Sequence, residues 1–174
     1  MLVKTFGSAV YGVEAITITI EVNVNNQGQH YFIVGLPDNA VKESLQRVES
    51  AIKSNNYYMP RTKLVVNLAP ADIKKTGSAF DLPIAIGTLA ATEQIENPER
   101  LAAYVIMGEL SLDGSVKSIR GALPIAIQAR KRVTQRAVAL HQQPLREDEQ
   151  GRAVARHELR HRDAVDVRQR LQAL

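Results

Sequence analysis

A short stretch rich in lysine and hydroxyl side chains carries the residues of this chain best suited to chemistry. The stretch consists of Lys74, Lys75, Thr76, Gly77 and Ser78. It follows the apolar segment 64–68 and precedes a predicted helix that begins at Asp81. Backbone N–H groups at a helix N-terminus, beside positive side chains, attract anions. The stretch therefore predicts an anion- or partner-binding loop whose ligand is a DNA phosphate or a neighbouring subunit.

A serine close to a lysine also raises the hypothesis of a serine hydrolase. In such enzymes a neutral lysine accepts the serine proton, and backbone amides stabilise the oxyanion. Ser78 is the candidate nucleophile, and Lys75 or Lys74 is the candidate base. The sequence favours a simpler interpretation, in which Ser78 and Thr76 cap the helix that follows.

Two further groups of residues are typical of ligand sites. His157, Glu158 and His161 fit the pattern H-E-x-x-H, which places two zinc ligands and a general base on one face of a helix. Only thirteen residues follow His161, and Val167 occupies the usual position of a third ligand. We therefore favour a polar helix braced by ion pairs at i, i+4, of which Glu158–Arg162 is one.

Aromatic and basic residues alternate just before the predicted strand 64–68. They are Tyr57, Tyr58, Arg61 and Lys63. Such residues stack on bases and bind phosphates in single-strand-binding proteins. The sequence favours the alternative that they are partly buried at the entry to the strand.

Composition bounds the class of protein. The chain has 174 residues, of which 45% are hydrophobic, and it has no cysteine. It has no run of 18 apolar residues and no secretory signal pattern, so we expect a cytoplasmic protein that does not enter the membrane. Residues 1–130 hold twelve basic and twelve acidic residues, whereas 131–174 hold ten basic and six acidic ones, so the net charge of +4 falls in the last part. We therefore expect a domain over 1–130 and an atypical Arg-rich tail over 131–174, either helical or not native to the fold.

Hydrophobic patterning predicts the elements of the first domain. A strand over 2–11 precedes an alternating strand over 16–22, and the turn residues 25–28 join the latter in a hairpin to a strand over 31–34. Asp38 is placed to cap one helix that ends near residue 55. A strand over 64–68 leads to a helix with Asp81 as its cap.

The remaining elements complete a mixed α/β order. Strands over 104–107 and 116–119 flank the turn signal Asp113-Gly114, and a helix covers 121–130. The predicted order is β-β-β-α-β-α-β-β-α, and we find no strand or helix of the usual apolar kind in 131–174. The order lacks the strict alternation of strand and helix that a Rossmann domain shows.

Three segments together resemble the N-terminal domain of the magnesium-chelatase-like AAA+ ATPases, the group that includes ComM and the YifB proteins. They are 34–38 with 41–48, 66–72 with 77–85, and 108–114 with 121–124. The resemblance implies a domain of the ribosomal S5 domain 2 type, similar to the Lon protease domain and to the C-terminal domain of RadA. In that family an ATPase module follows the domain, and ComM-like members are hexameric helicases that act on branched DNA. The resemblance thus implies a non-catalytic domain for assembly and substrate engagement, with a homo-oligomer, the ATPase module and DNA as partners.

The chain departs from the catalytic relatives at the residues that matter most. It has no phosphate-binding loop of the form G-x-x-x-x-G-K-[ST], so we expect ATP and Mg²⁺ to bind only the missing module. Matching the Lon motifs to this chain places Ala79 at the nucleophile position and Leu123 at the lysine position. A Lon-like hydrolase that uses Ser78 with a lysine therefore stays an alternative function.

Overall fold

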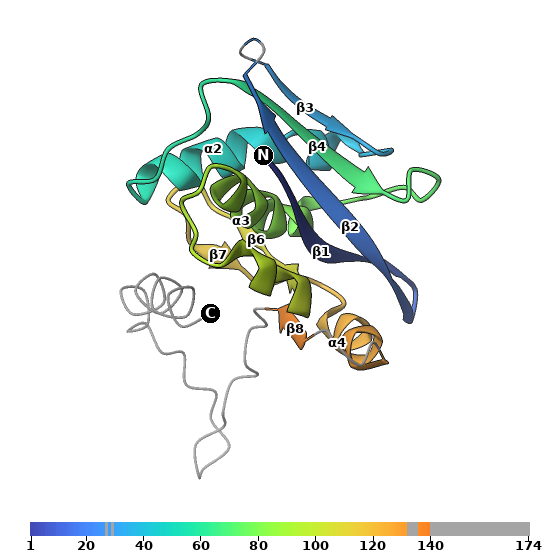
Figure 1. Ribbon diagram of the computed structural model, residues 1–174. Helices are drawn as coiled ribbons and strands as arrows, with labels where there is room; N and C mark the ends of the chain where they lie inside the picture. Colours follow the sequence, from blue (N-terminus) through green and yellow to red (C-terminus); the bar gives the residue numbers. More distant parts are fainter. Residues whose placement is uncertain (27, 29, 132–135, 140–174) are drawn as a thin grey trace. The chain divides into compact units, whose positions relative to one another are not determined.

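The computed structural model describes residues 1–26, 28, 30–131 and 136–139 of the chain. These residues belong to one compact unit, Met1–Leu140. Its elements confirm a mixed α/β fold, with parallel and antiparallel strand pairs beside the helices (Figure 1). The finer likeness to the S5 and Lon domains stays a prediction. None of the described helices is long and apolar enough to cross a membrane.

A four-stranded sheet has the order β1-β2-β4-β3. Its strands are β1 (Leu2–Tyr11), β2 (Glu14–Asn25), β3 (Tyr31–Val34) and β4 (Lys63–Ala69). β2 pairs with both β1 and β4 in the antiparallel sense, whereas β3 pairs with β4 in the parallel sense. The predicted hairpin between 16–22 and 31–34 is therefore wrong, because β4 lies between these two strands.

The burial of β4 explains why it takes the inner position. Leu64, Val66 and Leu68 are fully buried, so this strand carries an apolar row from one end to the other. β3 is only four residues long, and its Phe32 and Val34 are about half exposed, as suits a strand at a sheet edge. The turn residues 25–28 correctly mark the end of β2, but they do not determine which strand lies next to it.

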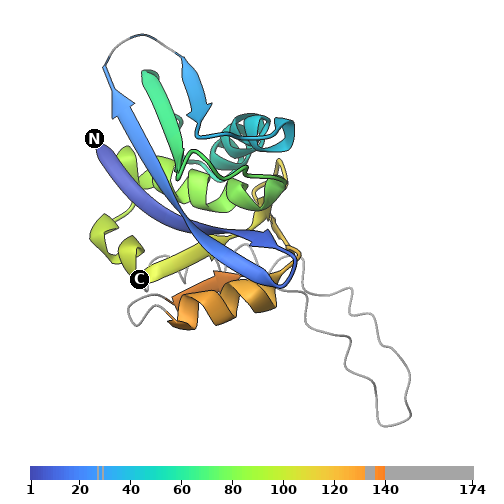
Figure 2. The ribbon, with the colours of Figure 1, turned by 90° about the vertical axis from the view of Figure 1, so that its right-hand side faces the viewer.

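Two helices cover one face of this sheet. A short helix α1 (Asn39–Lys42) leads into α2 (Ser44–Ser54), and a turn of 3-10 helix η1 (Ser78–Phe80) leads into α3 (Asp81–Ala91). The sequence predicted α1 and α2 as one helix, but the backbone breaks at Glu43. Every residue of α3 is buried, because α3 packs against β1 and β2 on one side and α2 on another (Figures 1 and 2). A helix that is apolar all round fits such a central place.

The last described elements form two small strand pairs and a helix. They are η2 (Pro98–Ala103), β5 (Tyr104–Met107), β6 (Glu109–Leu110), β7 (Val116–Lys117), α4 (Ala122–Lys131) and β8 (Arg136–Ala139). Asp113-Gly114 lies in the predicted turn, but the strand before it that pairs with β7 is β6 and not the predicted strand 104–107. β8 pairs in parallel with β5, so the expectation that no strand follows residue 130 is wrong. β8 contains the short apolar run Ala137–Ala139 directly after an arginine, and its pairing with β5 supplies the backbone hydrogen bonds of the strand.

Candidate functional site

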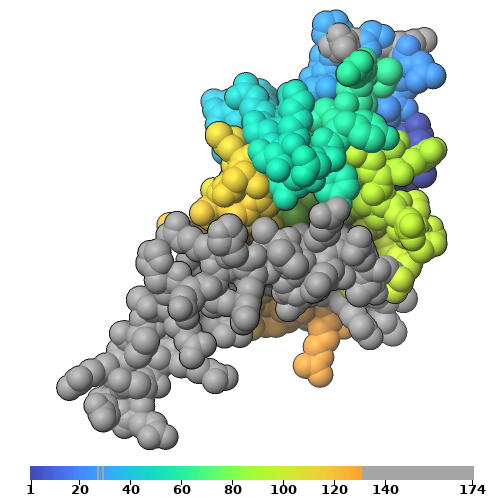
Figure 3. Space-filling model, turned by 90° about the vertical axis from the view of Figure 1, so that its left-hand side faces the viewer, coloured from blue at the N-terminus to red at the C-terminus, as the bar shows by residue number. Residues whose placement is uncertain are grey.

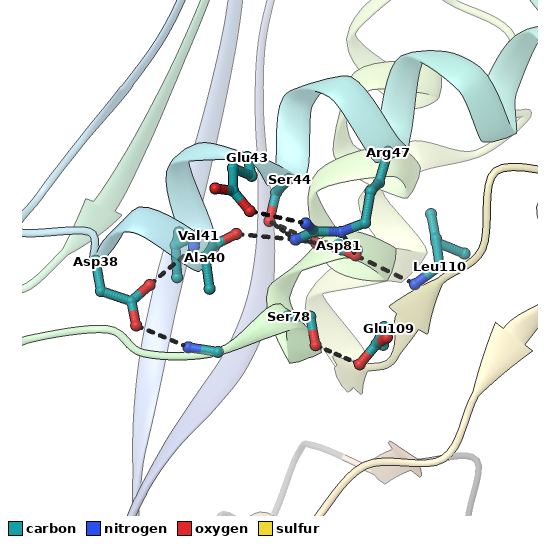
Figure 4. A network of polar contacts seen from close by, with 11 residues as sticks. Asp38, Ala40, Val41, Glu43, Ser44, Arg47, Ser78, Asp81, Glu109 and Leu110 are labelled. Carbon is teal, nitrogen blue, oxygen red and sulfur yellow. Dashed lines mark hydrogen bonds and ion pairs between the residues drawn. The ribbon is translucent and has the colours of Figure 1, made fainter.

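Asp81 lies at the centre of a polar network that joins α2, α3 and β6 (Figure 4). Its side chain is fully buried. Oδ1 accepts hydrogen bonds from Ser44 Oγ at 2.5 Å and Arg47 Nη2 at 2.9 Å. Oδ2 accepts from Arg47 Nε at 2.7 Å and the Leu110 amide at 3.2 Å. The hydrogen bonds that Arg47 donates to Asp81 raise the pKa of the Arg47 guanidinium.

These contacts correct the predicted role of Asp81. The residue begins α3, but α3 has no side-chain cap. The carboxylate instead bonds to groups from two other elements, because burial makes strong partners necessary for both oxygens. The prediction that Asp81 caps its own helix is wrong.

Asp38 joins the segment before α1 to the lysine-bearing loop. Oδ1 accepts from the Val41 amide at 2.8 Å, which confirms the predicted cap of α1. Oδ2 accepts from the Gly77 amide at 3.1 Å. The Asp38 amide also donates to the Lys75 carbonyl at 3.0 Å. The loop 74–78 is therefore fixed along the chain that leaves β3.

Lys75 points into the protein, not toward solvent. Its side chain is fully buried, and Nζ donates to the Gly35 carbonyl at 2.9 Å and also to the Pro70 carbonyl. Burial lowers the pKa of Lys75, and the charge of Asp72 partly opposes this effect. The Lys75 amine therefore bonds to the backbone directly after β3, and it does not reach a surface ligand.

Ser78 takes a partner other than a lysine. Its Oγ donates to the Glu109 carboxylate, whereas Lys75 Nζ bonds to two carbonyls. The structure therefore does not bring the predicted Ser78–Lys75 dyad together. Neither η1 nor α3 has a side-chain cap, so the interpretation of Ser78 and Thr76 as helix caps is wrong as well.

The first amides of α3 are occupied by the protein itself. The Asp81 amide donates to the Ser78 carbonyl, and the Leu82 amide donates to the Gly108 carbonyl at 3.0 Å. The Gly108 amide in turn donates to the Ala79 carbonyl at 2.9 Å. The Asp81 and Leu82 amides thus have partners within the protein.

The exposed part of the loop is small. Lys74 and Thr76 are exposed, and the Lys74 carbonyl accepts a hydrogen bond from the Tyr11 hydroxyl at 2.7 Å. Lys74 is the cation of this loop whose side chain reaches solvent. Binding of an anion or partner at residues 74–78 stays a prediction, and Lys74 is the residue that tests it.

The aromatic and basic residues before β4 lie in mixed surroundings. Tyr58 is exposed, and its hydroxyl donates to the Thr92 carbonyl at 3.1 Å. Lys63 Nζ lies 5.7 Å from the centre of the Phe32 ring, a distance typical of a cation–π contact. Tyr57 is half-buried and Arg61 is exposed. Base stacking by this group stays a prediction.

Other predicted site residues do not join the network. Leu123 is 72% exposed on α4. His157, Glu158 and His161 lie outside the described residues. Within the described ranges no group of three or more His, Cys, Asp or Glu residues is arranged to hold a metal ion.

Sequence reasoning gave no site role to Ser44, Arg47 and Glu109, which complete the network around α3. All three lie in the motif segments quoted above, yet their spacing resembles no known ligand or catalytic pattern. The pairing of Arg47 with Asp81 joins positions 34 residues apart, so the periodicity of the helix alone does not predict it.

Comparison with known proteins identifies the family of this chain. The family model for subunit ChlI of magnesium chelatase matches residues 20–143. The chain belongs to the magnesium-chelatase-like family of AAA+ proteins. The family match runs past residue 130 and includes β8, which agrees with the pairing of β8 and β5.

Several relatives are similar to most of this magnesium-chelatase-like chain. YifB of Salmonella typhimurium, an uncharacterized protein, is 46% identical over 121 residues, which are 70% of this chain and 24% of YifB. The competence protein ComM of Haemophilus influenzae is 40% identical over 130 residues, 75% of this chain and 25% of ComM. An uncharacterized protein of Mycobacterium tuberculosis is 36% identical over 128 residues, 74% of this chain and 25% of that protein. The chain thus matches about a quarter of the length of these relatives.

Proposed function

We propose that this chain serves as a non-catalytic domain for assembly and substrate engagement in a ComM-like AAA+ protein. In this proposal the motor is an ATPase module outside this sequence, and that module binds ATP and Mg²⁺. The chain is the N-terminal part of a cytoplasmic homo-oligomer, a hexamer in the parent protein. Branched DNA is the substrate that the parent acts on.

The occupied N-terminus of α3 is the observation that carries the non-catalytic role. A hydrolase of this kind needs a free nucleophile, a base beside it and unpaired amides. Here Ser78 bonds to Glu109, Lys75 bonds to the Gly35 and Pro70 carbonyls, and the Leu82 amide bonds to the Gly108 carbonyl. These bonds stabilise the fold, and they support a scaffold role for the loop.

The sequence and the family comparison support the proposal that the ATPase module lies outside this sequence. The 174 residues contain no G-x-x-x-x-G-K-[ST] loop, and the backbone amides of such a loop are what bind nucleotide phosphates. The chain matches only about a quarter of its AAA+ relatives.

A serine-reactive fluorophosphonate probe tests the non-catalytic role. The full chain and a Ser78→Ala variant are incubated with the probe and compared by intact mass. We expect no covalent adduct on either protein. An adduct that forms on the wild type and is lost in Ser78→Ala would establish the hydrolase and refute our proposal.

Binding to the motor is tested with YifB of Escherichia coli, which is 44% identical to this chain over 123 residues. The matching part of YifB is deleted, and the binding of the full chain to the remainder is measured by light scattering or interferometry. We expect binding that Lys74→Gln weakens. Lys42→Gln is the matched control, because Lys42 is also exposed but lies on α1. Absence of binding, or equal loss in both variants, would contradict the proposed contact at the loop.

A further inference from the structure

Strand β3 forms an open edge of the four-stranded sheet. The strand order ends at β3, which pairs with β4 on its inner side. In Figure 1 β3 is the outermost strand on its side of the sheet. Its four residues include no proline and no charged side chain, the two features that commonly keep another chain from pairing with an edge. The sequence of β3 therefore leaves this edge open to a further strand.

Half of the backbone groups of β3 point away from β4. The Leu64 amide donates to the His30 carbonyl at 3.0 Å, and the register pairs Tyr31 with Leu64. In a parallel pair, alternate residues of a strand direct their N–H and C=O groups to the same neighbour. The backbone of Phe32 therefore faces β4, and the amides and carbonyls of Tyr31 and Ile33 face outward. These outward groups alternate as β-strand addition requires.

Apolar side chains accompany the open edge. Phe32 is 47% exposed and Val34 is 46% exposed. They pair with Val65 and Asn67, so they lie on the face of the sheet opposite to the buried row of β4. A strand added beside β3 would place every second side chain next to these two residues. The edge therefore fits a segment with apolar residues at every second position.

The backbone directly after β3 is held in place. Leu36 is 52% exposed and has φ of +59°, a conformation that is costly for a residue other than glycine. Its carbonyl accepts from the Lys75 amide at 3.2 Å, and Lys75 Nζ donates to the Gly35 carbonyl at 2.9 Å. A Cβ at Gly35 would lie 2.1 Å from the Leu68 carbonyl oxygen. An edge with so little freedom loses little conformational entropy when a partner binds.

Positive charge lies beside the start of β3. The Tyr31 hydroxyl donates to the Pro60 carbonyl at 2.7 Å, so the segment that holds Arg61 and Lys63 runs past this end. In Figure 3 the blue atoms of this end and the teal atoms of the segment after α2 lie side by side at the top. Lys63 Nζ lies 5.7 Å from the centre of the Phe32 ring. Within the described ranges neither Arg61 nor Lys63 forms an ion pair.

These charges favour an acidic partner. Glu49 is an acid whose charge acts on Tyr31, but it is already paired with Lys53 at 2.6 Å. An acidic residue of a partner would therefore find two cations without a carboxylate of their own.

A peptide fits the edge better than a nucleic acid or a second copy. Val34 and Leu36 are aliphatic and offer no ring on which a base could stack. Outward N–H and C=O groups in alternation match another peptide backbone. A second copy would offer its own β3, whose four residues include no acid.

We propose that β3 binds an extended peptide of a partner protein by antiparallel strand addition. Apolar side chains of the peptide lie beside Phe32 and Val34, and an acidic residue at its C-terminal end lies beside Arg61 and Lys63. The antiparallel direction gives the more stable pairing. This partner is separate from the ATPase module and the DNA of the function proposed above.

A phage library of random peptides of about ten residues tests the edge. The full chain is the bait, and the full-length Val34→Lys variant is the comparison bait, because a lysine on an edge strand opposes strand addition. We expect peptides that are enriched on the wild type and not on Val34→Lys. They should carry apolar residues at every second position and Asp or Glu at the C-terminal end. No enrichment on the wild type, or equal enrichment on both baits, would overturn the proposal.

Leu2→Lys is the matched control, because Leu2 is 56% exposed on β1 at the other end of the strand order. It should retain the enriched peptides. Both variants should keep the circular dichroism spectrum of the wild type, since both side chains are exposed. Loss of the peptides in Leu2→Lys as well would contradict a site at β3.

The backbone contact is tested with the most enriched peptide. N-methyl groups are placed on one residue at a time, and the Kd for the full chain is measured by fluorescence anisotropy. We expect a loss of about 10-fold or more at every second residue, where the N–H faces β3, and little change between them. Equal effects at neighbouring residues would rule out strand addition.

The charge contact is tested with the double variant Arg61→Gln/Lys63→Gln. It should weaken the same peptide by at least about 3-fold at low salt. Arg120→Gln is the matched control, because Arg120 is also exposed but precedes α4. An equal effect of Arg120→Gln would overturn the acidic end of the peptide.

Other occupants give different results. Displacement of the peptide by an oligothymidylate would assign the edge to single-stranded DNA and overturn the peptide partner. A dimer in sedimentation equilibrium that Val34→Lys dissociates would assign the edge to a second copy, with the same consequence. Neither the fluorophosphonate probe nor truncated YifB reports on this edge, so the function proposed above stands or falls separately.

Discussion

A carboxylate without solvent exposure needs partners for both of its oxygens, and Asp81 receives four hydrogen bonds. Two of them come from the guanidinium of Arg47, whose side chain is 22% exposed. Removal of a single partner from a buried ion pair costs more than the pair contributes, because the remaining charge stays buried. Loss of either Asp81 or Arg47 alone should therefore destabilise the fold.

Replacement of Arg47 by methionine should lower the free energy of unfolding by about 3 kcal/mol, since the Asp81 charge then has only neutral donors. Urea denaturation of the full chain measures this change. The double variant Arg47→Met/Asp81→Leu should recover part of the loss. A single variant as stable as wild type would show that the pair contributes nothing.

Lys53→Met is the matched control on the same helix. Lys53 pairs with Glu49 at 2.6 Å, but both side chains are well exposed. Solvent screens such a pair. The variant should unfold at nearly the same urea concentration as the wild type.

The burial of Lys75 should make the free energy of unfolding depend on pH. Its pKa is lowered in the folded state, so the folded protein binds fewer protons than the unfolded chain at pH values between that lowered pKa and the ordinary value of 10.5. The free energy of unfolding of wild type should therefore rise relative to Lys75→Met as the pH increases through this window. A wild-type advantage that falls with pH would contradict the burial effect.

At the scale of elements, local patterns predicted most strands and helices but not their neighbours. The alternation in 16–22 predicted β2, and Asp38 predicted the start of α1, because a period of two and a cap are properties of a few adjacent residues. The position of β4 between β2 and β3 depends on pairings such as Tyr31 with Leu64, which are distant in sequence. Local turn signals carry no information on such pairings.

The candidate site shows the same division. The sequence predicted a binding role for the loop 74–78, which stays a prediction, but not the bond between the Gly77 amide and Asp38 that fixes the loop. It did not predict that Lys75 is buried or that Ser78 bonds to Glu109. Both outcomes depend on which distant backbone or side-chain groups pack against the loop.

Strand β8 makes a prediction about truncation. A chain ended after residue 130 loses the parallel partner of β5, whose Val105, Ile106 and Met107 are buried. It should melt at a lower temperature than a chain ended after residue 143, where the family match ends. Circular dichroism melts of the two truncated chains measure the difference. Equal melting temperatures would show that β8 adds no stability.

At the scale of the whole molecule, charge is unevenly distributed. Residues 1–130 are neutral by count and 131–174 carry the excess of four positive charges. Attraction of DNA phosphates depends on such excess charge and falls steeply with salt. Any affinity of the full chain for DNA should therefore depend mainly on residues outside the lysine-bearing loop.

Titration of labelled branched DNA with the full chain should show binding that weakens by at least about 10-fold between 50 and 200 mM salt. Lys74→Gln should change the affinity little, and a chain ended after residue 130, which loses all four excess charges, should bind much more weakly. Loss of affinity in Lys74→Gln, with the truncated chain unaffected, would instead assign the DNA contact to the loop.

The place of β4 between β2 and β3 also sets an order of events during synthesis. The β1–β2 hairpin has both of its strands once residue 25 has left the ribosome, but β3 has no partner until residues 63–69 follow. Until then Phe32 and Val34 are carried on an unpaired segment of the nascent chain. A pause in translation between residues 34 and 63 would therefore prolong the exposure of this apolar strand to chaperones and to other nascent chains.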